Sequence, residues 1–532
     1  MPTSRRRPVA ALALALMTAV SVSSCSQVSG TATAGDPVTP SRSAPSSSSA
    51  APASTAPGIT VPSTTPGASG SSSTPASAAA GGTVGSAGIG DPYYPTAGNG
   101  GYQVDHYDVN LTYDPPSNAL TATTTITGSV TSDQGLSRFN LDLQPNLTVS
   151  AVTVNDAAAT FEQDDAELVI SPATELAAAS PLTVTVTYAG SPDVVGGGTA
   201  NLGDGGWYRT DSGGAFVAGE PTGASTWFPV NEHPADTATF AVTATVPQGW
   251  NVIANGVSTT QNVPAAPAGM TTSRWVLDVP VASYLTTIYI DKFTTVDGTL
   301  SDGRPVVSAI APDAAADAPD LARQTGPVLD VLAGFFGPYP MPAAGGIFTG
   351  NRTGFALETA TRPVYSSGTD NLETVVHELA HQWYGDDVTI ERWSDICLNE
   401  CFASYATWLY AEKVNGTDLD RRWKNTVGNV LNEPRFWTSP LVDMGAGNEF
   451  TRVYDKGPVA LHALRREIGD DAFFAILKDW PATYGGKNAT FDDFEAFVNG
   501  KTGKDYTAFM DAWFRGTTIP DRQYLYPGTL GN

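Results

Sequence analysis

Three residues of this chain have the types and the spacing of a zinc site. His377 and His381 are four residues apart, so on a helix their imidazoles lie one turn apart on the same face. Glu400 follows His381 by 19 residues and supplies an oxygen ligand of a kind that zinc accepts. Three protein ligands leave the fourth position open, which is typical of a catalytic zinc ion. We therefore predict one Zn²⁺ per chain, bound by His377, His381 and Glu400.

Glu378 lies next to the first histidine, where it can serve as a general base. Zinc lowers the pKa of a bound water to about 7, and a neighbouring carboxylate can take the proton and later pass it to a leaving amine. The alternative is that His377 and His381 are core residues with satisfied hydrogen bonds. Glu400 at a matching distance argues against this alternative, so we predict that Glu378 is catalytic.

Two predicted helices must hold these residues. Apolar residues recur with helical period over residues 372–384, which contain both histidines, and over residues 394–414, which contain Glu400. Similar patterns predict further helices over residues 316–332, 457–468 and 491–498. We therefore predict a mainly helical catalytic domain over residues 297–532.

The preceding part of the chain has the pattern of β-strands. Residues 107–113, 120–126 and 182–188 alternate Thr and other polar residues with Val, Leu, Ile and Tyr at period two. This alternation is typical of an antiparallel sheet or sandwich with one buried face. We predict a β-rich domain over residues 96–296, and the whole chain is then an α+β multidomain protein.

The first residues have the pattern of an export signal. Arginines at 5–7 precede an apolar run over residues 9–20 that is too short to span a membrane. We predict a signal peptide over residues 1–24. The run ends at Cys25 in a pattern that resembles a bacterial lipobox, which predicts lipidation of Cys25; an ordinary signal peptide with an incidental cysteine is the alternative.

Residues 25–95 are predicted to be a disordered tether, because Ala, Ser, Thr, Pro and Gly dominate them and leave little apolar surface to bury. Lipid and tether together predict an extracytoplasmic protein of the bacterial cell envelope, attached to the membrane only through the anchor. The net charge is −25, from 28 Lys and Arg against 53 Asp and Glu. Such a charge repels phosphate backbones, so a nucleic-acid partner is not expected.

The zinc motif resembles that of the M1 family of zinc aminopeptidases. The family pattern is His-Glu-x-x-His, eighteen residues, and then Glu within Asn-Glu, which is how this chain reads from His377 to Glu400. The resemblance extends over about residues 102–526. It implies a saddle-like or sandwich-like N-terminal β domain, a thermolysin-like catalytic domain, and removal of N-terminal residues from peptides with a free amine. It also implies a short form without the large helical C-terminal domain of longer members.

Two further stretches of the resemblance concern substrate binding. Residues 355–359 stand where the family has Gly-x-Met-Glu-Asn, which implies that Glu358 binds the substrate α-amine and that Ala356 is a substrate-binding residue. Phe355 and Thr359 depart from the family pattern, so the side pocket should differ in shape. Residues 220–234 match a loop of the family's first domain, which implies that Glu220 is a second ligand of the amine.

A last stretch, residues 453–457, resembles the family's Tyr-x-Lys-Gly. It implies that the Tyr454 hydroxyl donates to the oxyanion of the tetrahedral intermediate, and loss of such a donor typically costs about 2.7 to 4 kcal/mol. Cys397 and Cys401 flank Glu400, and we interpret them as core residues, although their helical spacing also permits a disulfide.

The sequence therefore favours an exported zinc aminopeptidase. Two alternatives remain open: a family member that acts on a non-peptide substrate, such as an epoxide hydrolase, and a catalytically silent zinc-binding surface lipoprotein. The preferred N-terminal residue, the natural substrate and the oligomeric state are left open as well.

Overall fold

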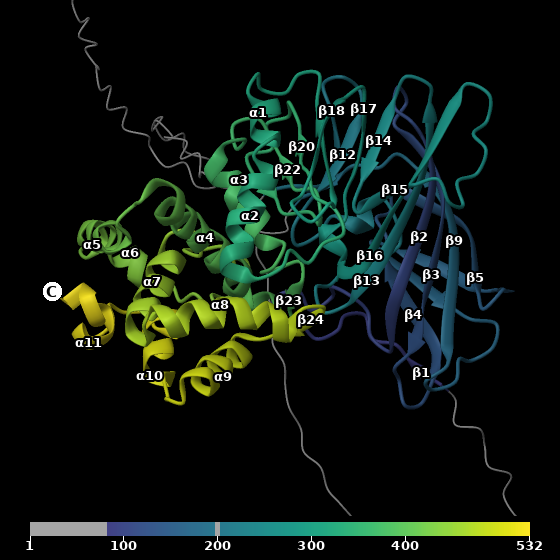
Figure 1. Cartoon of the computed structure of the whole chain (residues 1–532). Helices are drawn as coiled ribbons and strands as arrows, with labels where there is room; N and C mark the ends of the chain where they lie inside the picture. Colours follow the sequence, from purple (N-terminus) through teal and green to yellow (C-terminus); the bar gives the residue numbers. More distant parts are fainter. Residues whose placement is uncertain (1–81, 197–202, 532) are drawn as a thin grey trace, which may run out of the picture. The chain divides into compact units, whose positions relative to one another are not determined.

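The structure is a computed structural model that describes residues 82–196 and 203–531 (Figure 1). The predicted signal peptide, Cys25 and most of the predicted tether lie outside the described residues. Residues 82–95 are described, and they correct the tether's predicted end. They include strand β1 (Thr83–Val84). Asp91 is only 3% exposed, and its carboxylate pairs with the Trp393 N–H and with His233 Nε2. The ordered part of the chain therefore begins earlier than residue 96.

The first ordered part is β-rich, as predicted. Its eight-stranded sheet is antiparallel except where β13 pairs with β2. Side chains of β2 and β9 alternate between buried and outward positions, which is the period-two pattern of the sequence. In spatial order the strands are β15 (Val257–Thr259), β16 (Met270–Ala282), β13 (Thr237–Pro247), β2 (Tyr102–Asp114), β3 (Ala119–Val130), β9 (Pro181–Gly190), β5 (Leu147–Val154) and β6 (Ala157–Ala158).

Two smaller sheets complete this part of the molecule. The four-stranded sheet has the order β1, β4 (Leu136–Asp142), β8 (Glu167–Ser171) and β7 (Thr160–Asp164). The five-stranded sheet has the order β10 (Val194–Val195), β11 (Gly205–Arg209), β12 (Ala215–Ala218), β17 (Ile288–Asp291) and β14 (Asn251–Ala254). The second sheet matters for function, because the loop after β12 carries Glu220.

A further five-stranded sheet connects the β-rich part to the helical part. Its order is β18 (Thr294–Thr299), β19 (Pro305–Ile310), β20 (Ile347–Phe348), β22 (Val364–Tyr365) and β21 (Ala356–Leu357). The predicted boundary at residue 297 thus falls inside β18, and the sheet begins at Thr294. Strand β21 leads directly into Glu358.

Helices dominate the rest of the described chain, which confirms the predicted α+β class. The long ones are α2 (Thr325–Phe336), α3 (Leu372–His381), α4 (Cys397–Asn415), α5 (Leu419–Val430), α7 (Lys456–Ile468), α8 (Asp470–Tyr484) and α9 (Phe491–Thr502). The short ones are α1 (Ala318–Ala322), α6 (Pro434–Trp437), α10 (Thr507–Met510) and α11 (Arg522–Leu525), and strands β23 (Val388–Ile390) and β24 (Lys487–Ala489) pair between helices.

One predicted helix is two helices in the structure. The pattern over residues 316–332 divides into α1 and α2. Pro327, in the first turn of α2, has no N–H to donate to the carbonyl of Arg323 four residues earlier, which favours a break between the two segments.

Candidate zinc site and substrate pocket

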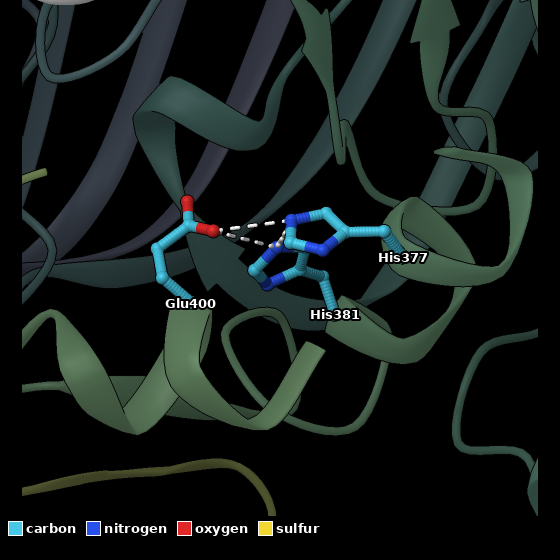
Figure 2. Close-up of side chains that lie close together, drawn as sticks. All are labelled: His377, His381 and Glu400. Atoms are coloured by element: carbon cyan, nitrogen blue, oxygen red, sulfur yellow. Dashed lines mark hydrogen bonds and ion pairs between the residues drawn. The ribbon is translucent and has the colours of Figure 1, made fainter. Parts of the chain in front are cut away.

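Helix α3 places the two histidines. The Asn371 side chain caps the helix by accepting a hydrogen bond from the Thr374 N–H at 3.1 Å. Val375, Val376 and Leu379 are buried in the core and fix the rotation of the helix. His377 and His381 then project together from one face of α3 toward α4 (Figure 2).

Glu400 lies in the first turn of α4 and reaches the same point from the opposite side (Figure 2). Its Oε2 is 3.1 Å from His377 Nε2 and 3.5 Å from His381 Nε2, and the two Nε2 atoms are 3.2 Å apart. Burial tends to raise the Glu400 pKa, but the charge of His381 and the hydrogen bond from His377 outweigh it and lower this pKa to about 2.

These distances fit one zinc ion. Ligand atoms that coordinate zinc at about 2.0–2.2 Å in a tetrahedron lie about 3.3–3.6 Å from one another, and the three separations in the structure are close to this range. The second nitrogen of His381, Nδ1, lies 3.0 Å from the Tyr384 carbonyl oxygen, to which it can donate. That contact leaves Nε2 as the metal-binding atom. The residues present therefore fit zinc.

Three more carboxylates surround this triad. Glu378, Glu358 and Glu220 are each at most 6% exposed. Burial raises the pKa of all three, and neighbouring carboxylates raise it further. Glu358 Oε1 accepts a hydrogen bond from the Tyr284 hydroxyl at 3.3 Å, whereas Glu220 Oε1 has no hydrogen-bond partner among the described residues. Such a cluster is stabilised by cations: a metal ion and a substrate ammonium.

Gln382 fixes the position of Glu358. Its Nε2 donates to the Glu358 carbonyl oxygen at 3.0 Å, and its Oε1 accepts from the Thr361 N–H at 2.8 Å. Because Gln382 lies at the C-terminal end of α3, these two bonds hold the segment after β21, which carries Glu358, against the helix that carries the histidines. Sequence reasoning did not identify Gln382 or Tyr284; the position of Gln382 directly after His381 was the available signal.

Tyr454 lies in the turn before α7, and its ring centroid is 5.9 Å from that of His377. The side chain is half-buried and lines the same pocket as the zinc triad.

The structure brings eight of the nine predicted site residues to one pocket; Cys25 lies outside the described residues. The pocket is lined by Glu220, Ala356, Glu358, His377, Glu378, His381, Glu400 and Tyr454, together with Asp204, Phe355 and Leu357. Asp204 had not been identified from the sequence.

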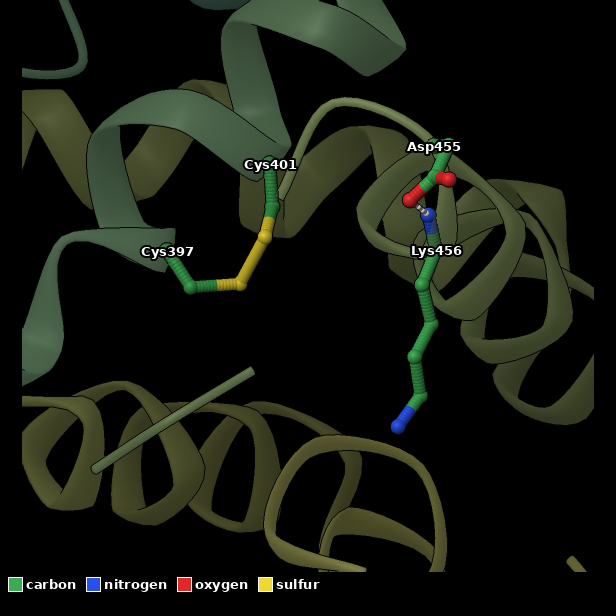
Figure 3. The surroundings of a disulfide bond; sticks show 4 residues. All are labelled: Cys397, Cys401, Asp455 and Lys456. Atoms are coloured by element: carbon green, nitrogen blue, oxygen red, sulfur yellow. Dashed lines mark hydrogen bonds between the residues drawn. A yellow bond between two sulfur atoms is a disulfide. The ribbon is translucent and has the colours of Figure 1, made fainter. Parts of the chain in front are cut away.

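Cys397 and Cys401 are bonded to each other, which is the alternative that their helical spacing left open (Figure 3). Both are fully buried, as predicted. The one-turn spacing at the start of α4 brings their α-carbons to 4.8 Å, within the range of a disulfide. The bridge spans the turn that carries Glu400, and it lies beside the start of α7 near Lys456 (Figure 3).

Both the β-rich part and the helical part of this chain match domains of known proteins. Residues 103–285 match the Peptidase M1 N-terminal domain, and residues 344–513 match the Peptidase family M1 domain. An M1 zinc metallopeptidase from Deinococcus radiodurans is 30% identical, with a TM-score of 0.74 over 82% of this chain and 99% of that one. A mutant of the D. radiodurans protein bound to a Tyr-Ser-Ala substrate is 29% identical, with the same TM-score and coverage.

Longer relatives match in the same region. Human glutamyl aminopeptidase is 28% identical over 57% of this chain and 34% of its own length. Human aminopeptidase N is 26% identical over 54% of this chain and 34% of its own length. The chain thus spans about a third of the length of these two relatives, whereas it spans nearly the whole of the D. radiodurans protein.

Proposed function

The chain belongs to peptidase family M1, and we propose that it is a zinc-dependent aminopeptidase that hydrolyses the N-terminal peptide bond of peptides. One observation carries the proposal. The three ligand atoms of His377, His381 and Glu400 lie 3.1–3.5 Å apart in a pocket that also contains two buried carboxylates, Glu358 and Glu220, suited to a free ammonium.

Zinc, when bound, polarises the scissile carbonyl and lowers the pKa of a water molecule to about 7. Glu378 takes the proton of the attacking water and delivers it to the nitrogen of the leaving peptide. Its position supports both steps, because it is adjacent to His377 on α3 and lines the pocket.

Glu358 and Glu220 select peptides with a free N-terminus. A substrate ammonium between them forms charge-assisted hydrogen bonds and gives the unpartnered Glu220 Oε1 a donor. The two residues follow strands of different sheets: Glu358 comes directly after β21, and Glu220 lies in the loop after β12. The β-rich part of the chain therefore contributes to recognition. With the amine held there, the first peptide bond is the one presented to the zinc.

Tyr454 stabilises the negative charge that develops on the carbonyl oxygen. A phenol is a neutral donor, so its hydrogen bond to the uncharged carbonyl oxygen of the substrate is weak. The bond becomes stronger when negative charge develops on that oxygen in the transition state. Its closeness to His377 supports this role.

We further propose that the protein acts in the bacterial cell envelope, held by a lipid on Cys25. The apolar run, the cysteine and the tether composition support this location. Over residues 82–196 and 203–531, helices of the length and apolarity needed to cross a bilayer are absent.

The test of the function is hydrolysis of an alanine or leucine arylamide by the purified protein. We expect turnover that a chelator abolishes and stoichiometric zinc restores. An epoxide substrate serves as the control for the non-peptide alternative. Full activity in a metal-free sample would refute the zinc mechanism, and stoichiometric zinc without turnover of any arylamide or peptide would support a binding lipoprotein.

A further inference from the structure

The pocket contains one acidic side chain that the mechanism does not use. Of the described residues that line it, five are carboxylates and none is lysine or arginine. Glu400 is assigned to zinc, Glu378 to proton transfer, and Glu358 and Glu220 to the α-amine. Asp204 has no such role.

Packed aromatic rings hold Asp204 at the pocket wall. The Tyr208 hydroxyl donates to the Asp204 carbonyl oxygen, and the Tyr208 ring lies 6.3 Å from the ring of Phe355, centroid to centroid. Tyr208 itself stacks on Phe216 at 5.0 Å, and Phe216 is fully buried. The backbone beside Asp204 is therefore tied to Phe355, which also lines the pocket three residues before Glu358.

We propose that Asp204 binds the cationic side chain of an N-terminal lysine or arginine, so that the enzyme prefers peptides with a basic first residue. The inference rests on the proposed aminopeptidase function. With the α-ammonium held by Glu358 and Glu220, the first side chain lies among Phe355, Ala356 and Asp204. The long alkyl stem of lysine or arginine packs on the apolar residues while its charge reaches the carboxylate.

The unpartnered, buried Glu220 Oε1 gives independent support that this pocket receives cations. An acidic first residue brings a carboxylate into a pocket that already contains five, which is unfavourable. The net charge of −25 could not establish this preference, because it describes the average field and not the lining of the pocket.

The test compares lysine and norleucine arylamides, which have similar stems but differ in the terminal charge. We expect a higher kcat/KM for lysine in the wild type. Asp204→Asn should lower the lysine-to-norleucine ratio by roughly three- to tenfold, the range for a solvent-accessible ion pair in a partly enclosed site, and leave the norleucine rate unchanged. Asp211→Asn is the control, because Asp211 is an exposed carboxylate beyond the other end of β11 and does not line the pocket. This variant should leave the rates with both arylamides unchanged.

A second measurement needs no variant. The wild-type ratio should fall as ionic strength rises, because salt screens an exposed pair. A lysine-to-norleucine ratio near one, or a ratio that Asp204→Asn does not change, would overturn the inference. If the norleucine arylamide is still turned over, the proposed aminopeptidase function stands. Absence of turnover with every arylamide would instead overturn the proposed function, and the inference with it.

Discussion

Two buried glutamates, Glu378 and Glu400, differ in the neighbours of their carboxylate oxygens. Glu400 Oε2 lies within 3.5 Å of both histidine Nε2 atoms, whereas Glu378 lines the pocket beside them. Both are isosteric with glutamine, so the same substitution at each position changes charge and basicity with little change of shape. Only one of the two should affect the metal.

Glu378→Gln should keep zinc and lose turnover, because it removes the base but no ligand. The expected decrease in kcat is about 10²- to 10⁴-fold. Glu400→Gln should lower zinc affinity by about 10-fold or more, with the fold retained. Metal content after dialysis, together with kcat on an arylamide, checks both. If Glu378→Gln lost zinc as well, the assigned roles would be wrong.

At the residue scale, local spacing was sufficient to predict that His377, His381 and Glu400 lie together, because the two histidines share α3 and Glu400 lies in the first turn of α4. It was not sufficient for Tyr284, which donates to Glu358 across 74 residues of sequence. Asp204 likewise lies at the pocket because Tyr208 donates to its carbonyl oxygen and packs against Phe355. Such contacts depend on tertiary packing, which single-sequence patterns do not encode.

At the scale of elements, α4 and α7 pack closely where the disulfide lies. A β-carbon built on Gly457 comes within 2.7 Å of Cys401 Sγ and 3.0 Å of its α-carbon. The disulfide limits how far Cys401 can move aside, so the start of α7 must be glycine for the two helices to meet. Tyr454 lies just before this contact, and its position therefore depends on it.

Gly457→Ala should destabilise the protein by about 1–3 kcal/mol through overpacking, and lower kcat by displacing Tyr454. Gly428→Ala in α5 is the matched control, because nothing lies within 4 Å of a β-carbon there. It should be neutral or stabilising by up to about 1 kcal/mol. Denaturant unfolding and kcat check the pair. Equal effects at both positions would argue against a tight α4–α7 contact.

Element types followed from the sequence where one periodicity dominated, as in β2, β9 and α3. The bonded state of Cys397 and Cys401 did not, because a four-residue helical spacing is compatible with both thiols and a disulfide. The division of residues 316–332 required the hydrogen-bonding consequence of Pro327, which hydrophobic periodicity does not contain.

At the scale of the whole molecule, the last part of the predicted tether, residues 82–95, belongs to the ordered body. Asp91 accepts a hydrogen bond from the Trp393 N–H at 3.0 Å and lies 3.1 Å from His233 Nε2, so it connects the β-rich part with the turn before α4. The composition of residues 82–95 resembles a linker, and only these distant partners distinguish it from one. The end of the tether was therefore predicted too late.

Cys25→Ser should release the protein from the membrane fraction, because the substitution removes the thiol to which the proposed lipid is attached. Cell fractionation followed by immunoblotting measures this, and arylamide activity of the released protein should match that of the wild type. Unchanged membrane association would argue for another mode of attachment. Release of the wild type in equal amount would favour an ordinary signal peptide.

The central claim is that the zinc site acts as an exopeptidase because Glu358 and Glu220 bind a free ammonium. The direct test is the ratio of kcat/KM for one peptide in its free and N-acetylated forms, in the wild type and in Glu358→Ala. Acetylation removes the charge and leaves buried carboxylates unpaired, so we predict a wild-type ratio of about 100 or more. Glu358→Ala should keep zinc and greatly reduce the ratio. A wild-type ratio near one would contradict the aminopeptidase function and leave only the zinc site.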